Sequence, residues 1–374
     1  MIIYALVALI TVLAVLRVDN KCVKLSYGYT KQQVLNGLSL LSVFLILFAI
    51  SALRLNVGND YAKYVEYFHL IRCKLDTETV VPTEPGFNLV CLLIYLISGR
   101  RENYLLMFAF FAFLTIYFFM KGMFEQSDNF PLTFLMFMTL GYYFQSFSMV
   151  RYYFALALSF YSIPLVLDKK WGKFILVIVL GAFFHKSVLL VIPFYFLAQW
   201  SWKKYQVAIG LLFCSTFFFF KDFYLNLFLK FYPTYEETEY LNSGTSMISI
   251  ARCVAILLLA LIMYKKLIKD DRKMQFFFYC NLGALIVYLC LTFLPSVSRA
   301  GYYLSVTQLL FVPALIKGIE NAKVRKFITA LVVFGCIGYF AIFLKYEAPA
   351  NGLRILPYET WVYHDMVDIL SDVS

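Results

Sequence analysis

The chain has 374 residues, of which 62% are hydrophobic, 20% aromatic and only 15% charged. This composition leaves more apolar surface than one or two soluble cores could bury, so it excludes a soluble globular protein and indicates a multi-pass membrane protein. The formal net charge is +11. Because the basic residues are concentrated in short loops between apolar runs, where they set membrane topology, the charge gives no indication of nucleic-acid binding.

Apolar runs of about 17–20 residues predict membrane-spanning helices. The first run has no basic region before it and no cleavage site after it, so we expect a retained anchor. Two shorter runs meet at His185-Lys186 and are interpreted as a hairpin of short helices whose tip lies below the membrane surface. Twelve crossings are predicted in all, at 1–16, 35–53, 104–120, 130–147, 151–167, 173–184, 187–199, 205–220, 248–264, 275–294, 301–317 and 326–344.

The apolar segment 87–98 decides the orientation of everything after it. A further crossing there would place the basic loop 168–173 outside, against the positive-inside rule, so we interpret 87–98 as a re-entrant or interfacial helix. The loops then assigned to the cytoplasm hold 19 of the 33 Lys and Arg residues but only 7 of the 22 Asp and Glu residues, and both termini are outside. These loops are 17–34, 121–129, 168–173, 200–204, 265–274 and 317–326.

The chain 1–374 is predicted to form a single integral membrane domain. Three external segments are long enough to contact a substrate: the loops 54–103 and 221–247 and the C-terminal tail 345–374. Within 221–247, the acidic and aromatic run 232–237 favours sugar stacking or a lid, or is a solvated loop. The eight cysteines form no CxxC motif and no Cys/His cluster with metal-ligand spacing, so neither a metal site nor a disulfide framework is expected.

Four ionisable residues lie within or at the ends of apolar runs: Arg54, Arg151, His185 and Arg299. A central Arg costs about 2.5–3.5 kcal/mol to insert, so each is a candidate for function. The predicted topology places all four on the external side. A guanidinium gives bidentate, charge-assisted hydrogen bonds and keeps its charge, which suits a phosphate or pyrophosphate ligand. The alternative for each arginine is an interfacial anchor that extends its charge to the membrane surface.

Two of the arginines stand at the start of predicted helices. Arg151 and Arg299 each add a positive charge to a helix N-terminus, which already favours an anion, so together they are predicted to clamp a pyrophosphate, with Arg54 as a third cation. His185 follows a predicted helix break. Breaks at membrane depth are tolerated mainly where they line a cavity, which favours function; the alternative is a histidine bonded to a carbonyl group.

The loop between the second and third predicted crossings carries two carboxylates. Asp60 is near the start of a short helix on which Tyr61 and Tyr64 share one face, and it serves either as an N-cap or as a functional acid. Glu84 precedes a turn into the segment 87–98 and is either a turn residue or functional. The sequence contains no phosphate-binding glycine loop and no DxD pair, so a lipid-carried sugar donor is favoured over an activated nucleotide.

Six short pieces of this chain resemble, in the same order, the EpsG-like, Wzy-type polymerases of bacterial exopolysaccharides, capsules and O-antigens. One departure is Tyr152, where such proteins commonly have Gln, so a Gln-specific sugar contact is in doubt. The pieces are Arg54 to Tyr64 with Gly58-Asn59-Asp60-Tyr61, Glu84-Pro85-Gly86-Phe87, Arg151 with Ala155, Phe184-His185-Lys186-Ser187 with Pro193, Ser298-Arg299 with Tyr302-Tyr303 and Pro313, and Leu356-Pro357-Tyr358.

The resemblance implies an all-α glycosyltransferase of GT-C-like architecture that needs neither metal nor cofactor and faces outward from the bacterial cytoplasmic membrane. It would join polyprenyl-pyrophosphate-linked oligosaccharides, as donor and acceptor, at the outer leaflet, with membrane lipid, a flippase and a chain-length regulator as partners. Arg151, Arg299 and Arg54 would stabilise the leaving pyrophosphate, while His185, Asp60 and Glu84 compete as the base. The predicted substrate-contact residues are Tyr61, Tyr64, Tyr152 and Tyr358.

Two other functions compete with the polymerase. A flippase for lipid-linked oligosaccharides would also use an arginine-lined cavity, but a transporter is expected to have internal repeats and charges that reach both faces. Here the intramembrane charges gather on one predicted side and no repeat is visible. A membrane acyltransferase would use a histidine in a membrane cavity, but it does not by itself require three arginines.

Overall fold

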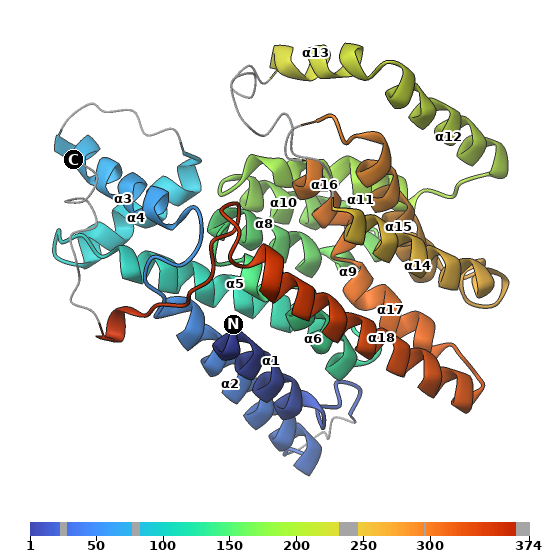
Figure 1. Cartoon of the computed structure of the whole chain (residues 1–374), viewed down its shortest axis with the longest axis horizontal. Coiled ribbons are helices and arrows are strands. Elements are labelled where there is room, and N and C mark those ends of the chain that lie inside the picture. The colour runs from blue at the N-terminus through green and yellow to red at the C-terminus, as the bar shows by residue number, and fades with distance from the viewer. Residues whose placement is uncertain (23–27, 77–82, 232–245, 295–296, 364–374) are drawn as a thin grey trace. The chain divides into compact units, whose positions relative to one another are not determined.

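The computed structural model describes residues 1–22, 28–76, 83–231, 246–294 and 297–363. Within these ranges the regular structure is helical, and β-structure is limited to one isolated bridge between Arg54 and Thr360. The predicted all-α class is therefore confirmed. Contacts divide the chain into two compact units, which are described separately (Figure 1). The first comprises Met1–Tyr161, Val179–Lys186 and Ile319–Ser374, and the second comprises Ser162–Ile178 and Ser187–Gly318.

The first unit is built around α5. This helix packs against α2 and α8, while α3 packs against α4 and α6 packs against both α1 and α18. Side-chain caps fix several helix starts, including a capping box between Thr30 and Gln33 at α2. The helices are α1 (Ile2–Val15), α2 (Lys31–Ala52), α3 (Tyr61–Asp76), α4 (Pro85–Ile97), α5 (Tyr104–Gln126), α6 (Phe130–Thr139), α7 (Tyr142–Gln145), α8 (Val150–Tyr161), α18 (Ala322–Ile342), η5 (Phe343–Glu347) and η6 (Trp361–Tyr363).

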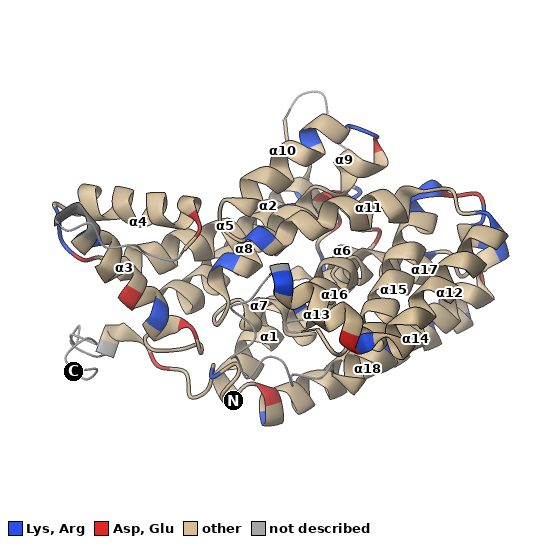
Figure 2. Ribbon diagram, turned by 90° about the horizontal axis from the view of Figure 1, so that it is seen from above, with Lys and Arg blue, Asp and Glu red and all other residues tan. Residues whose placement is uncertain are grey.

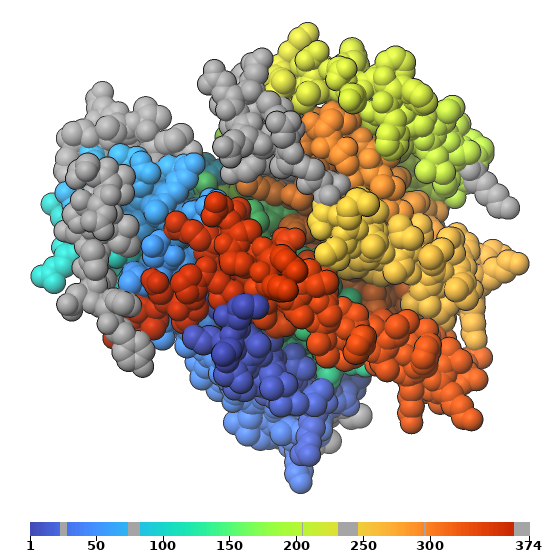
Figure 3. Space-filling model, viewed as in Figure 1, coloured from blue at the N-terminus to red at the C-terminus, as the bar shows by residue number. Residues whose placement is uncertain are grey.

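The C-terminal segment is fastened to the N-terminal helices of this unit. The Tyr4 hydroxyl donates to the Ile355 carbonyl oxygen at 2.6 Å, and the Tyr358 hydroxyl donates to that of Ile50 at 3.0 Å. Figure 3 shows α1 in dark blue beside the red C-terminal segment. Residues at opposite ends of the sequence therefore close the same part of the unit.

The second unit is organised around α15, which packs against α11, α12, α14, α16 and α17. Buried polar side chains join its helices: Asn281 donates to the Cys253 carbonyl oxygen at 3.0 Å and accepts from Gln308 at 2.8 Å. Helix α10 runs across the division between the units. The helices are α9 (Ile163–Leu167), α10 (Trp171–Ala182), η1 (Lys186–Leu190), α11 (Val191–Gln199), α12 (Lys204–Phe219), α13 (Lys221–Phe231), α14 (Met247–Ile262), η4 (Tyr264–Ile268), α15 (Arg272–Cys290), α16 (Val297–Ser305) and α17 (Gln308–Lys317).

Several predicted spans are interrupted. The expectation of one helix over 130–147 is wrong, because Gly141 adopts φ +81 between α6 and α7, a conformation that ends a helix. The span 301–317 is likewise divided into α16 and α17. The predicted break at His185 is confirmed, since α10 ends at Ala182 and the next helical turn begins at Lys186.

Five helices in the described ranges are long and apolar enough to cross a membrane, or six if one pair bent by 85° counts as a span. In the most apolar 18-residue stretch of the first and last of these helices, only 22% of the residues are buried, against 72% in the third helix. Apolar side chains of the first and last helices therefore face outward. Charged residues lie mainly at helix ends and in loops (Figure 2). These features indicate a polytopic membrane protein, while the count of twelve crossings stays a prediction. The five helices are Lys31–Ala52, Tyr104–Gln126, Val150–Leu167, Arg272–Cys290 and Ala322–Glu347, and the bent pair is Tyr205–Phe219 with Lys221–Lys230.

Candidate active site

Arg151 and Glu84 form an ion pair in the first unit, between Nη1 and Oε2. Helix α8 begins at Val150, so Arg151 lies in its first turn, as predicted. Glu84 occupies the N-cap position of α4, but its side chain makes no capping hydrogen bond, because the carboxylate meets Arg151 instead. The two side chains are 17% and 15% exposed. The pair is therefore largely withdrawn from water, which strengthens the attraction, yet it remains accessible.

The start of α4 packs on the break that follows α10. The Gly86 N–H donates to the Phe183 carbonyl oxygen at 2.8 Å. A Cβ atom on Gly86 would lie 2.7 Å from that oxygen, so the approach requires glycine. The Lys186 N–H lies 3.5 Å from Glu84 Oε1. The Glu84 carboxylate thus links the first turn of α8 to the chain immediately after His185.

His185 belongs to the same cluster. Its ring packs edge-on against Tyr152, with 5.4 Å between ring centroids. Tyr152 directly follows Arg151 in α8, and it is buried. The structure therefore brings together three of the residues predicted from the sequence, Arg151, Glu84 and His185, around the first turn of one helix.

Aromatic rings surround the Arg151 guanidinium. Its central carbon lies 5.5 Å from the Tyr64 ring centroid, 5.8 Å from that of Tyr67 and 5.2 Å from that of Phe87. Such cation–π contacts contribute about 0.5–2 kcal/mol each, depending on desolvation. Burial raises the pKa of the Tyr64 phenol, and the charge of Arg151 opposes that rise. Arg151 Nε has no hydrogen-bond partner within the described part of the chain.

Arg54 has a different environment, although it lies in the same unit. Its side chain is 1% exposed and stands between the rings of Phe108 and Phe147, at 4.8 and 5.2 Å. One terminal nitrogen donates to the carbonyl and hydroxyl oxygens of Ser51, and the other lies 3.5 Å from the Phe147 carbonyl oxygen. Burial lowers the pKa of this guanidinium, and nearby phenols oppose the effect. The Arg54 guanidinium is therefore engaged by oxygens of the protein itself, and its contact with pyrophosphate stays a prediction.

The loop before α3 is held against the chain that precedes α8. Gly58 has φ +112 and packs on the Phe147 backbone with no room for a Cβ atom. The neighbouring Asn59 N–H donates to Ser148 Oγ at 3.2 Å. The Asp60 carbonyl oxygen accepts from the Tyr64 N–H at 3.0 Å, which places Asp60 at the predicted N-cap position. A catalytic role for its side chain stays a prediction.

The predicted substrate-contact tyrosines lie mostly in the protein interior. Tyr61 and Tyr64 share a face of α3, as predicted, and pack on Phe108 with centroid distances of 4.3 and 6.2 Å. Tyr358 packs edge-on against Tyr4 at 5.8 Å. Tyr61, Tyr64 and Tyr152 are buried. Their contact with a sugar therefore stays a prediction.

Arg299 lies in the second unit. Helix α16 begins at Val297, four residues before the predicted span, and Arg299 is in its first turn, which confirms its position at a helix start. The side chain is partly buried. The proposed clamp of Arg151 with Arg299 stays a prediction, as do the external placement and the roles of the run 232–237, which lies outside the described residues.

Sequence reasoning missed three features of the first unit. Tyr67 was not a candidate, although it is one helical turn from Tyr64 and faces the same guanidinium. The direct Arg151–Glu84 pairing was also missed, because 67 residues separate the partners. The third is a cluster in which Glu102 binds both His69, at 2.8 Å, and Arg72. Among the residues described, no three His, Cys, Asp or Glu side chains are grouped to hold a metal ion.

The fold and this cluster define a class: an all-helical, polytopic membrane protein with an arginine–carboxylate pair set beside a helix break. A family model described as the EpsG family matches residues 38–360, so the chain belongs to that family, the family of Wzy-type exopolysaccharide polymerases. The match covers every residue of the candidate site. Neither the curated proteins nor the solved structures gave a match. Family membership implies a polysaccharide polymerase with glycosyltransferase-type activity.

Proposed function

We propose that the protein joins oligosaccharide repeat units carried on polyprenyl pyrophosphate, at the outer leaflet of a bacterial cytoplasmic membrane. The observation that carries this proposal is the part-buried Arg151–Glu84 pair beside His185, in a member of a polymerase family. A lipid-pyrophosphate donor brings its own leaving group. Catalysis then depends on stabilising the negative charge that develops on that group, and a desolvated guanidinium does so strongly.

On the donor side, the bond between the anomeric carbon and the pyrophosphate oxygen breaks, and the electron pair stays with the pyrophosphate. Arg151 stabilises that charge through its planar fork. Glu84 is a positioning residue, because it holds Nη1 and fixes the guanidinium among the aromatic rings. Arg299, at the start of α16, supplies the second positive charge. The reaction is metal-independent in this proposal, because the arginines provide the charge that a divalent cation would otherwise supply.

On the acceptor side, a sugar hydroxyl attacks the anomeric carbon and its proton passes to a base. Three residues compete for this role: His185, Asp60 and Glu84. The carboxylate of Glu84 is already engaged by Arg151 and by the Lys186 N–H, which makes it a poorer proton acceptor. We favour His185, because an imidazole exchanges protons near neutral pH and this one packs on Tyr152, the residue that follows Arg151.

The membrane setting of this proposal comes from loop charge. Twelve crossings in a GT-C-like arrangement, with α4 as the re-entrant or interfacial helix, put the candidate site on the external face. A flippase that delivers lipid-linked repeat units to that face and a regulator of polymer length are the expected protein partners. The supporting observation is that the basic loops and the candidate site fall on opposite sides of the predicted topology.

The direct test is reconstitution. Lipid-linked repeat units isolated from cells that lack this protein are added to the purified protein in detergent, without nucleotide sugar, ATP or divalent metal. We expect dimers and longer chains, and excess chelator should change nothing. Unreacted repeat units in the presence of folded protein would contradict the polymerase and favour the lipid-linked oligosaccharide flippase.

The same assay separates the candidate bases. His185→Ala should slow the reaction by roughly 10²–10⁴-fold if the imidazole is the general base. Asp60→Asn and Glu84→Gln are the rival variants, compared at matched substrate binding. A larger rate loss in Asp60→Asn than in His185→Ala would move the role to Asp60.

A further inference from the structure

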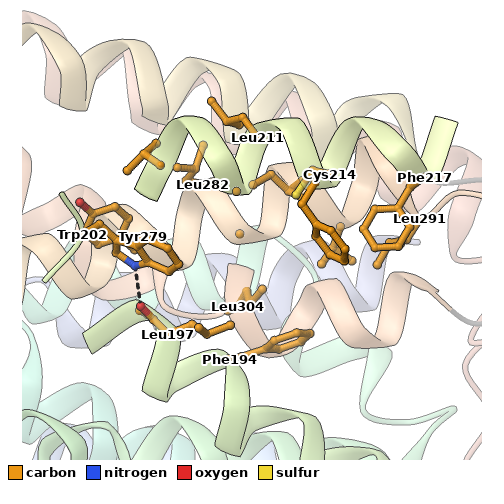
Figure 4. Close-up of a pocket in the computed structure, with 17 residues that line it drawn as sticks. Phe194, Leu197, Trp202, Leu211, Cys214, Phe217, Tyr279, Leu282, Leu291 and Leu304 are labelled. Carbon is orange, nitrogen blue, oxygen red and sulfur yellow. Dashed lines mark hydrogen bonds between the residues drawn. The ribbon is translucent and has the colours of Figure 1, made fainter. Parts of the chain in front are cut away.

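The second unit contains an apolar cavity beside α12. It has a volume of about 410 Å³ and is lined by side chains of α11, α12, α15 and α16 (Figure 4). Trp202 and Tyr279 lie at one end, and Phe217 and Leu291 lie at the other. The Trp202 indole N–H donates to the Leu197 carbonyl oxygen at 2.8 Å, so its polar atom is satisfied and its ring is free to line the cavity.

A polar cavity adjoins the aromatic end. This second cavity, of about 320 Å³, shares Trp202 and Tyr279 with the apolar one. Its other lining residues are polar, charged or aromatic: Ser201, Tyr264, Lys269, Asp270, Arg272 and Gln275. The two cavities therefore meet at a pair of aromatic rings, with an apolar lining on one side and a polar, charged lining on the other.

A third cavity extends the basic region. It has a volume of about 580 Å³, shares Ser201 and Arg272 with the second, and adds Lys169 and Lys203. The two polar cavities thus present four cations, Lys169, Lys203, Lys269 and Arg272, against one acid, Asp270. Arg272 also donates to Ser201 Oγ, which fixes it where the two cavities meet.

The apolar cavity, the aromatic pair and the basic cavities follow one another in an order that is complementary to a membrane lipid. Trp and Tyr side chains are enriched at the level of lipid headgroups. Basic pockets between helices on the cytoplasmic side bind anionic headgroups. All four cations lie in the loops that charge counting assigns to the cytoplasm, and Trp171 and Trp200 line the third cavity beside them.

We propose that the second unit binds an anionic phospholipid of the cytoplasmic leaflet. Its phosphate lies among Lys169, Lys203 and Arg272, and one acyl chain passes Trp202 into the apolar cavity between α12 and α15. The occupant joins α12, which packs on the rest of the unit mainly through α15, to the core of the unit. None of the residues that line these cavities is a candidate residue of the polymerase site, and the lipid site does not depend on the proposed reaction.

The protein's tryptophans provide the readout. Three of the four, Trp171, Trp200 and Trp202, line these cavities, and Trp361→Phe removes the fourth. The full-length protein with this change is reconstituted in phosphatidylcholine nanodiscs that contain a small fraction of brominated phosphatidylglycerol or brominated phosphatidylcholine. We expect brominated phosphatidylglycerol to quench at a mole fraction that is at least about fivefold lower and approaches a hundredfold lower if all three basic residues contribute fully, since each basic residue near the surface contributes about fivefold. Equal quenching by both lipids would overturn the proposal.

Charge variants test the headgroup contacts. Lys169→Gln, Lys203→Gln and Arg272→Gln combined should abolish the preference. The matched control combines Lys265→Gln, Lys323→Gln and Lys326→Gln, exposed residues outside these cavities that remove the same charge. The control should keep the preference. Equal loss in both sets would show a general surface potential rather than a site and would refute the proposal.

A filling variant tests the acyl chain. A Cβ atom on Gly210 of α12 meets nothing within 4 Å, so Gly210→Phe can occupy the apolar cavity without a backbone clash. It should reduce quenching, while Gly335→Phe on α18, which also has open space, should not. Unchanged quenching in Gly210→Phe would contradict the acyl-chain position. Displacement of phosphatidylglycerol by an equimolar polyprenyl phosphate would assign the site to the isoprenoid carrier instead.

Discussion

Arg54, which is buried, and Arg151, which is part-buried, lie in the same unit and have different kinds of partner. Arg54 is held by carbonyl and hydroxyl oxygens between two aromatic rings and is 1% exposed. Arg151 is held by a carboxylate and is 17% exposed. A guanidinium enclosed by neutral backbone groups supports the fold around it. One held by a carboxylate through Nη1 can offer its remaining donors to a second anion. We therefore propose that the environment, rather than the residue type, separates a structural arginine from a functional one.

The largest effect is expected at Arg54. Arg54→Ala leaves a cavity beside Phe108 and Phe147 and deprives the oxygens of Ser51 and Phe147 of this donor, so it should lower stability by about 3–5 kcal/mol. Thermal unfolding of the detergent-purified protein measures this. Arg354→Ala is the control, because Arg354 is exposed and its side chain donates only to Asn56 among the described residues, at 3.0 Å. A comparable loss of thermal stability in the two variants would contradict a structural role for Arg54.

The next effect concerns activity rather than stability. Arg151→Lys keeps the positive charge but loses the planar fork, so the initial rate of polymerisation should fall about 10²–10³-fold. Thermal stability and accumulation in the membrane should stay close to those of the parent protein. A near-normal amount of polymer from this variant would instead support the alternative that Arg151 is an interfacial anchor.

Gly58 tests the backbone that supports both arginines. It lies against Phe147, whose carbonyl oxygen also faces Arg54. Gly58→Ala combines a strained φ with a backbone clash and should cost about 2–3 kcal/mol. Gly28→Ala shares the positive φ but meets nothing within 4 Å, so it should cost about 1 kcal/mol or less. Equal midpoints of thermal unfolding for the two variants would show that the Phe147 contact contributes little.

The smallest effect is the coupling between Arg151 and Glu84. A double-mutant cycle with Arg151→Gln and Glu84→Gln should give a coupling free energy of about 0.5–2 kcal/mol in thermal stability, because the pair is mostly buried. The exposed Lys170–Asp168 pair should give roughly 0–0.5 kcal/mol in the same cycle. Strictly additive single changes at Arg151 and Glu84 would mean that the ion pair does not form in solution.

Local features of the fold could be predicted from the sequence, whereas the pairing of residues in the site could not. The all-α class, the break at His185 and the helix starts at Arg151 and Arg299 follow from local signals, namely apolar run length and the position of charges. The division of 130–147 escaped prediction, because Gly141 sits in an otherwise continuous apolar run and only its backbone conformation reveals the break. The Arg151–Glu84 pair depends on packing Gly86 against Phe183, a long-range contact that no local pattern encodes.

The central proposal is that Arg151, more than the enclosed Arg54, binds the pyrophosphate of the lipid carrier. Binding of polyprenyl pyrophosphate to the purified protein, measured by ³¹P NMR titration in detergent, tests it most directly. We predict that Arg151→Gln weakens binding at least tenfold, that Glu84→Gln leaves it equal or tighter because the competing carboxylate charge is gone, and that Arg54→Lys leaves it unchanged. Unchanged binding in Arg151→Gln, with weakened binding in a folded Arg54→Lys, would contradict the account.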